Sequence, residues 1–105
     1  MTEGQLQDAI RLVLTGDSIV LWRNNCGQAE IRGRYVRYGV GNPGGADLIG
    51  IGPGGQFVAV EIKLPGKHPT PEQRMWGALV ERKGGTYVVL RSVEEATQWL
   101  TNLRA

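Results

Sequence analysis

Two apolar stretches joined by a short glycine-bearing link constrain this chain more than any other feature of its 105 residues. Residues 46–51 and 57–63 flank the link 52–56, which contains the run Pro53-Gly54-Gly55. Apolar runs separated by a few residues that include glycine are typical of a β-hairpin. If that run forms the loop, the pairing of the two strands follows along their whole length.

The predicted pairing brings two acids together. Counting back from the loop in equal steps puts Asp47 opposite Glu61 and Gly45 opposite Lys63. Directly opposed residues share one face of a sheet, with Cβ atoms ~4.5–5.5 Å apart, and alternate residues of a strand point the same way. We therefore expect two carboxylates and one ammonium group to form a single small patch.

This patch is suited to binding a hard cation. Like charges directly opposite one another destabilise a sheet, so a divalent ion between Asp47 and Glu61 explains their pairing. Oxygen ligands alone favour Mg²⁺ or Mn²⁺. Such an ion polarises a phosphoryl group and lowers the pKa of an attacking water, while Lys63 aligns that water or stabilises charge on the phosphate oxygens. The patch therefore predicts metal-dependent cleavage of a phosphodiester.

Simpler interpretations of the same residues stay open. A Glu-Ile-Lys alternation is common on half-exposed strands, and an aspartate before a strand is ordinary turn chemistry. A register slip of one residue would also turn Asp47 to the face opposite Glu61. Small residues around the patch and a basic segment upstream of it favour the metal site.

Apolar residues at helical spacing, each run preceded by a capping pattern, predict three helices. The first ends near Gly16 and the second at Gly84-Gly85, since glycine commonly ends a helix. The capping residues and their partners three positions later are Thr2 with Gln5, Thr70 with Gln73, and Ser92 with Glu95.

Strands are expected at residues 19–22, 35–38 and 86–90 in addition to the hairpin, because β-branched and aromatic residues dominate these segments. Residues 24–34 are expected to form a loop, and residues 39–45 a glycine-rich loop. The resulting order is α-β-β-β-β-α-β-α. It predicts an α/β fold, with a mixed β-sheet flanked by helices, in a single domain spanning residues 1–105.

Basic residues gather upstream of the acidic hairpin although the net charge is only +2. The stretch from residue 23 to 37 contains a single acid, Glu30, and four arginines, Arg23, Arg32, Arg34 and Arg37. Such a cluster favours a polyanionic partner. A solvated basic loop explains it equally well.

The lone Cys26 excludes an intrachain disulfide and a cysteine-based metal site. A single thiol fits a reducing compartment. The sequence also has neither a signal-peptide pattern nor an apolar run approaching ~20 residues. We therefore expect an intracellular, cytoplasmic protein with no membrane partner.

The hairpin and the segment after it resemble a known family. Residues 44–76 contain an aspartate at the start of one strand, Glu61-Ile62-Lys63 on the next, and Gln73 on the following helix. This pattern resembles the VRR-NUC domain of the PD-(D/E)XK nuclease superfamily, with Ala46 in place of the usual proline before Asp47. The resemblance extends from about Glu3 to Leu100.

The resemblance implies a restriction-endonuclease-like fold and Mg²⁺- or Mn²⁺-dependent cleavage of DNA without a covalent enzyme intermediate. Asp47 and Glu61 would bind the metal, with the backbone carbonyl of Ile62 as a further ligand. Lys63 would assist the water, and Gln73 would lie beside the site. The capping role of Gln73 is an equally good interpretation, and the two roles are compatible.

Further residues match the family pattern or its expected substrate. Glu3 matches an acid on the first helix of many relatives; it shares a helical face with Leu6 and Ile10, so we expect it to face the sheet. A first-turn glutamate favoured by the helix dipole is the alternative. The residues expected to contact DNA are Arg23, Asn24, Asn25, Arg32, Arg34, Arg37 and Lys67.

Family members of this length are expected to act as homodimers on branched DNA such as four-way junctions, in bacteria or phage-infected cells. Cleaving two strands symmetrically needs two sites, and this chain supplies one. The leading hypothesis is therefore a Holliday-junction resolvase-like endodeoxyribonuclease acting on branched or duplex DNA. The alternative is a non-catalytic DNA-binding or accessory module that keeps the nuclease fold.

Overall fold

A four-stranded mixed sheet forms the centre of the computed structural model, which describes residues 1–16 and 18–104. The strand order is β1-β4-β5-β6, with antiparallel pairing of β1 to β4 and of β4 to β5, and parallel pairing of β5 to β6. The strands are β1 Val20–Arg23, β4 Leu48–Ile51, β5 Phe57–Ile62 and β6 Thr86–Leu90.

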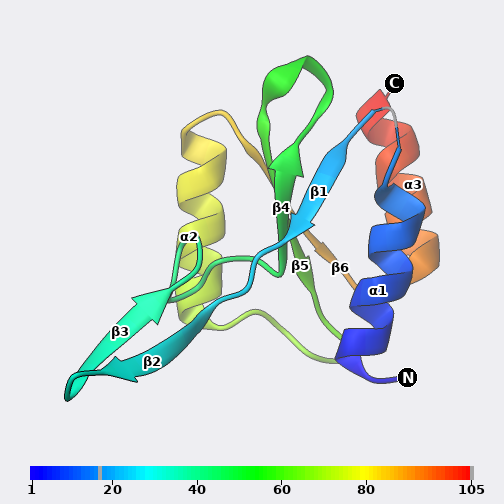
Figure 1. Cartoon of the computed structure of the whole chain (residues 1–105). Helices are drawn as coiled ribbons and strands as arrows, with labels where there is room; N and C mark the ends of the chain where they lie inside the picture. Colours follow the sequence, from blue (N-terminus) through cyan, green and yellow to red (C-terminus); the bar gives the residue numbers. More distant parts are fainter. Residues whose placement is uncertain (17, 105) are drawn as a thin grey trace.

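Helices cover both faces of this sheet (Figure 1). Helices α1 (Glu3–Leu14) and α3 (Val93–Arg104) pack against each other on one face, and α2 (Pro71–Arg82) lies on the other against β5 and β6. Parallel strands need a long crossover connection, and α2 supplies it between β5 and β6. None of the helices within the described residues is long and apolar enough to cross a membrane. The predicted mixed sheet flanked by three helices is confirmed.

The main core lies between the sheet and the pair of helices α1 and α3. In β5, the alternate residues Val58, Val60 and Ile62 are fully buried in this core. Side chains of a strand alternate between faces, so Ala59 and Glu61 point to the α2 face. The helices contribute Leu6, Ile10, Leu14, Ala96 and Leu100.

The predicted hairpin register is correct. Ile51 pairs with Phe57 and Ile49 with Ala59 across β4 and β5. The loop is a short 3-10 turn, Pro53–Gly55, closed by a 2.8 Å hydrogen bond from Gly52 N–H to the Gln56 carbonyl. The one-residue slip is thereby excluded.

The predicted capping boxes of α1 and α2 are present. Thr2 and Gln5 exchange side-chain and backbone hydrogen bonds, as do Thr70 and Gln73. The third box differs. The Ser92 hydroxyl accepts from Glu95 N–H at 3.0 Å, but the Glu95 carboxylate accepts from the N–H of Arg91 and not from that of Ser92.

The loop expected at residues 24–34 is wrong in part, because a second hairpin occupies most of it. Strand β2 (Gly27–Ile31) pairs only with β3 (Arg34–Tyr38), which contains the predicted strand 35–38. The connecting residues Arg32 and Gly33 have φ of 52° and 77°. Two-residue turns of this kind favour asparagine or glycine at both positions. Arg32 occupies the first position, so the sequence does not indicate a hairpin turn here. The described residues therefore contain one strand more than predicted.

Candidate functional site

Asp47 and Glu61 meet at the edge where β4 begins and β5 ends. Asp47 immediately precedes β4, and extending the β4–β5 register by one step places it opposite Glu61. The N–H of Ile62 donates a 2.8 Å hydrogen bond to Asp47 Oδ2. This bond holds the Asp47 carboxylate against the backbone of β5, so the two acids adjoin as the sequence predicts.

Glu61 is an acid enclosed by protein. The Glu61 residue is only 2% exposed to solvent. Gln73 Nε2, on α2, donates to Glu61 Oε1 at 3.3 Å. The second oxygen, Oε2, is buried and has no hydrogen-bond partner among the described residues. A buried carboxylate oxygen without a partner is costly, so it is a vacant acceptor for a cation or a proton.

The electrostatics of Glu61 follow from this enclosure. The pKa of Glu61 is raised to about 9, first by burial, then by hydrogen bonding to the adjacent Asp47 carboxyl and by its charge, and least by the charge of Glu3, while the Lys63 ammonium lowers it. A proton therefore occupies the Glu61 carboxyl at neutral pH unless a cation replaces it. Metal binding to such a group releases that proton.

Two adjoining carboxylates are a donor set of the kind that a magnesium-type ion takes from proteins. Within residues 1–16 and 18–104 no three or more His, Cys, Asp or Glu side chains converge to hold a metal. Structural zinc takes four protein ligands. Mg²⁺ commonly uses one or two carboxylates and completes its shell with water and substrate phosphate. The Asp47–Glu61 pair with its free Oε2 meets that requirement.

Lys63 and Gln73 lie beside the acids. Lys63 follows β5, is partly exposed, and its N–H donates to the Leu90 carbonyl at 3.1 Å. Gln73 serves both predicted roles at once. Its Oε1 accepts from the N–H of Thr70 at 2.8 Å, while its Nε2 reaches Glu61. The cap therefore orients the amide that contacts the acid.

Glu3 departs from the expectation. The prediction that its side chain turns from solvent toward the sheet is wrong, because Glu3 is exposed at the first turn of α1 while Leu6 and Ile10 are buried. The first turn of a helix leaves its side chains less covered than the turns that follow. Its charge nevertheless acts on Glu61.

Asn24 anchors the loop that carries Asp47. Its Nδ2 donates to the carbonyls of Val40 (2.8 Å) and Ala46 (2.9 Å), and its Oδ1 accepts from the N–H of Val40 at 2.9 Å. Its own N–H donates to the Asp47 carbonyl at 2.8 Å. The side chain is 9% exposed and its amide is engaged within the protein, so the structure gives Asn24 an anchoring role, and its DNA contact stays a prediction. The neighbouring Asn25 is exposed.

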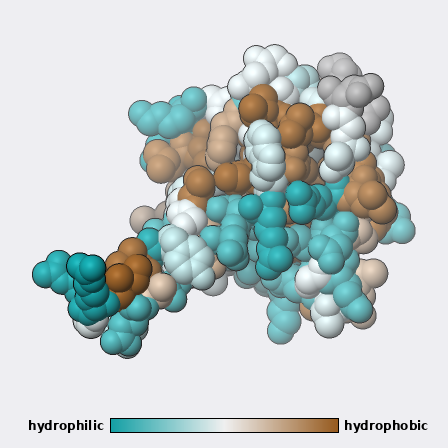
Figure 2. All heavy atoms as spheres, in the orientation of Figure 1, coloured by the Kyte–Doolittle hydropathy of each residue, from teal (hydrophilic) through white to brown (hydrophobic). Residues whose placement is uncertain are grey.

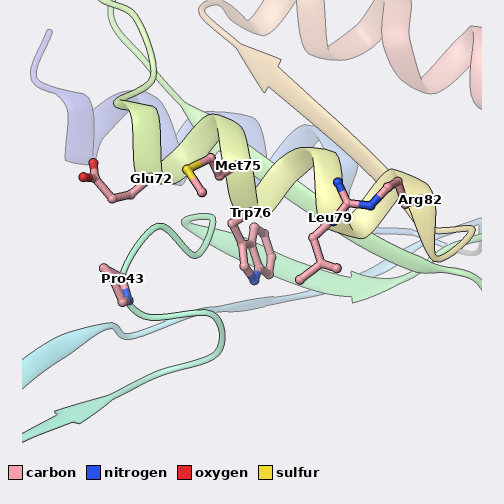
Figure 3. A pocket seen from close by; sticks show the side chains of 6 residues that line it. All are labelled: Pro43, Glu72, Met75, Trp76, Leu79 and Arg82. Atoms are coloured by element: carbon pink, nitrogen blue, oxygen red, sulfur yellow. The ribbon is translucent and has the colours of Figure 1, made fainter.

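The glycine-rich loop between β3 and β4 packs against α2 (Figure 3). A Cβ on Gly41 would lie 2.2 Å from the Trp76 indole, and one on Gly44 would lie 2.5 Å from the Glu72 backbone. Both glycines also have positive φ. These two glycines therefore let the loop pack closely against α2.

A cavity of about 350 Å³ opens beside this contact. Figure 3 shows Trp76 and Leu79 of α2 pointing from the helix toward the side of the loop, where Pro43 lies. Trp76 follows Gln73 by one turn of α2, and neither Asp47 nor Glu61 lines the cavity. The residues that line it are Pro43, Glu72, Met75, Trp76, Leu79 and Arg82.

The predicted basic residues do not gather around the acids. Arg23 pairs with Leu48, whose side chain is in the core under α1 and α3, so Arg23 leaves the opposite face of the sheet from Asp47. Lys67 is exposed, and its carbonyl accepts from the Arg91 guanidinium at 3.0 Å. The remaining three, Arg32, Arg34 and Arg37, belong to the β2–β3 hairpin.

Two residues near the site were not predicted. The Tyr87 hydroxyl is buried without a partner among the described residues, and burial, then Glu61 and Asp47, raise its pKa to about 12. Burial and the same two acids raise the pKa of the Cys26 thiol, while Asn24 lowers it. Tyr87 is opposite Ala59 through the β5–β6 pairing, which no local sequence signal specifies.

Comparison of the chain with models of protein families and with the sequences of curated proteins gives no match.

We predict that Asn24→Ala destabilises the protein by about 2 kcal/mol or more, because it leaves buried backbone groups of the loop unpaired. Asn25→Ala, at the exposed neighbouring position, serves as the matched control and should change stability by less than ~0.5 kcal/mol. Urea unfolding of both variants measures the difference. Equal midpoints for the two would contradict the anchoring role.

Glu61 should make the metal-free protein less stable as pH rises. Its pKa is near 9 folded and 4.5 in the unfolded reference; between these values the folded state holds the proton and the unfolded state does not. Its stabilising contribution is therefore complete below about pH 4.5 and lost progressively up to about 9. Glu61→Gln stays neutral and should flatten this dependence in thermal melts with EDTA.

The same melts with Mn²⁺ test the cation. At a hundredfold excess over its dissociation constant, a bound ion stabilises by about 2.7 kcal/mol. We expect stabilisation of the wild type that grows with pH and is lost in Glu61→Gln. If the stability of the wild type and of Glu61→Gln varied with pH in the same way, both in EDTA and in Mn²⁺, the raised pKa and the cation site would both be wrong.

Proposed function

We propose that this protein is a Mg²⁺- or Mn²⁺-dependent endodeoxyribonuclease that hydrolyses DNA phosphodiester bonds. The observation that carries the proposal is the adjoining pair of the half-buried Asp47 and the buried Glu61, held in register with one carboxylate oxygen of Glu61 unsatisfied. Two like charges that adjoin in a folded core need a compensating cation or a proton. Lys63 on the same side supplies the amine expected beside such a pair.

Each residue then has a defined task. Asp47 and Glu61 would hold the ion, and the backbone carbonyl of Ile62 would supply a third oxygen. When bound, the ion polarises the phosphodiester and activates water. Lys63 orients that water and balances charge on the phosphate oxygens. Gln73 positions Glu61 through its 3.3 Å hydrogen bond, and Glu3 contributes an outer negative charge at the site.

The fold supports the same proposal. Two acids on adjacent antiparallel strands, followed by a crossover helix that returns to a parallel strand, suit the restriction-endonuclease-like fold implied by the resemblance to VRR-NUC domains. The proposed substrate is branched DNA such as a four-way junction, cut by a homodimer, since each chain supplies one acid pair. The mass in solution, measured by light scattering, tests that assembly.

We expect Asp47→Asn to abolish metal-dependent cleavage, because it removes a charged ligand. Lys63→Met should slow single-turnover cleavage by about 100-fold or more. The matched controls are Asp8→Asn and Lys83→Met, at exposed positions on α1 and after α2. The assay uses labelled four-way junction, flap and linear duplex DNA with Mg²⁺ and with Mn²⁺.

Two results would contradict the proposal. One is cleavage by folded Asp47→Asn at the wild-type rate. The other is an absence of products from the wild type on every DNA with both metals; DNA binding in that case would identify the protein as a non-catalytic DNA-binding module, as the alternative holds.

A further inference from the structure

The β2–β3 hairpin, residues 27–38, stands apart from the body of the protein, and we call it the arm. Figure 1 shows it extending away from the central sheet. Among residues 1–16 and 18–104, its strands pair only with each other, and the buried core contains none of its residues. A two-stranded hairpin alone is marginally stable in water at best. The arm therefore has unused surface for a partner.

The arm carries the net charge of the whole chain. It contains Arg32, Arg34, Arg37 and one acid, Glu30, for a formal charge of +2. The other nine basic and nine acidic residues of the chain cancel. All four charged side chains of the arm are exposed. A polyanion is thus the complementary partner.

The placement of these charges distinguishes a groove from a flat surface. Arg34 pairs with Ile31 and Arg37 with Gln28. The two arginines are three residues apart on β3, and successive side chains of a strand alternate between its faces. Arg34 and Arg37 therefore lie on opposite faces of the ribbon. Arg32 occupies the turn at its tip. A ribbon that docks flat on a surface needs charge on one face only. Charge on both faces and at the tip suits a slot with phosphates along both walls.

The faces are amphipathic as well as charged. Ala29, Ile31 and Val36 share one face, while Tyr35 on the other is 73% exposed. Figure 2 shows both hydrophobic and hydrophilic side chains gathered on the arm. The major groove of B-DNA, about 12 Å wide, admits a two-stranded β-ribbon and presents apolar thymine methyl groups as well as polar base edges.

We propose that the arm enters the major groove of double-stranded DNA and anchors the protein there by phosphate contacts on both walls. This inference rests on the proposed function in so far as DNA is the ligand. The root of the arm is fixed, because Asn42 Nδ2 donates to the carbonyls of Gly27 (2.6 Å) and Tyr38 (2.9 Å). Docking of the arm thereby sets the orientation of the body that carries the acids.

The test compares two triple variants in fluorescence-anisotropy titrations of a labelled duplex, with EDTA present so that no cleavage occurs. The arm variant is R32Q/R34Q/R37Q. The control, R11Q/R82Q/K83Q, removes the same charge from exposed positions of the body. Each phosphate contact contributes about 0.9 to the slope of log K against log salt. We expect the arm variant to lose two to three units of slope and roughly 100-fold in affinity at 0.1 M salt, and the control to bind like the wild type.

Groove choice is tested with modified duplexes. Glucosylated 5-hydroxymethylcytosine fills the major groove. The wild type should therefore bind a duplex that contains it no more tightly than the arm variant binds the unmodified duplex. Distamycin, which fills the minor groove, should leave wild-type binding unchanged. Competition by distamycin without an effect of glucosylation would overturn the assignment of the major groove.

Failure of this inference differs from failure of the nuclease proposal. If the wild type cleaves DNA and the arm variant binds and cleaves equally well, the arm inference alone is wrong. If the wild type never cleaves but binding still depends on the arm, the nuclease proposal alone is wrong. Loss of a dimer in the arm variant, with DNA affinity per chain unchanged, would show that the arm contacts a second copy and would overturn the inference.

Discussion

The pairing of β4 with β5 is the constraint on which the rest of the site depends. The turn Pro53–Gly55, with Gly54 and Gly55 at positive φ, sets the register. A slip by one residue would expel Val58, Val60 and Ile62 from the core, and each such side chain contributes about 1.5–3 kcal/mol by burial. The same hydrophobic energy that stabilises the sheet therefore holds Asp47 opposite Glu61. Charge repulsion between two carboxyl groups is too weak to shift a strand fixed in this way.

Enclosure of Glu61 explains how the repulsion is tolerated. An exposed pair of acids would be screened by water and would ionise near their ordinary values, so neither would need a cation. Burial against α2, where the Gln73 amide donates one long hydrogen bond, makes the charged form of Glu61 costly, and the adjacent Asp47 carboxyl adds to that cost. The pair must then bind a proton or a metal ion. Local conflict of this kind, inside an otherwise consistent fold, is typical of functional sites.

The sequence predicts those parts of the structure that local chemistry determines. The hairpin turn, the boxes at Thr2 and Thr70 and the acid pair all follow from residues close in sequence or joined by one short turn. The arm was missed because Arg32 adopts φ of 52° at a position where asparagine or glycine is usual. The role of Asn24 depends on the path of the loop up to 22 residues away. The place of Tyr87 depends on the parallel β5–β6 register, which is set by packing and not by a turn.

One loop joins the arm to Asp47, and hydrogen bonds fix this loop at both of its ends. Asn42 binds both strands at the root of the arm, and Asn24 binds the loop at Val40 and again at Ala46, beside Asp47. Glu61, in contrast, lies within β5 between strands on both sides. One acid is therefore fixed by the central sheet, while the other is positioned by the segment that also fixes the arm. Asp47 is thus held from two sides, because Asn24 binds its backbone carbonyl while the Ile62 N–H of β5 binds its carboxylate and keeps it opposite Glu61.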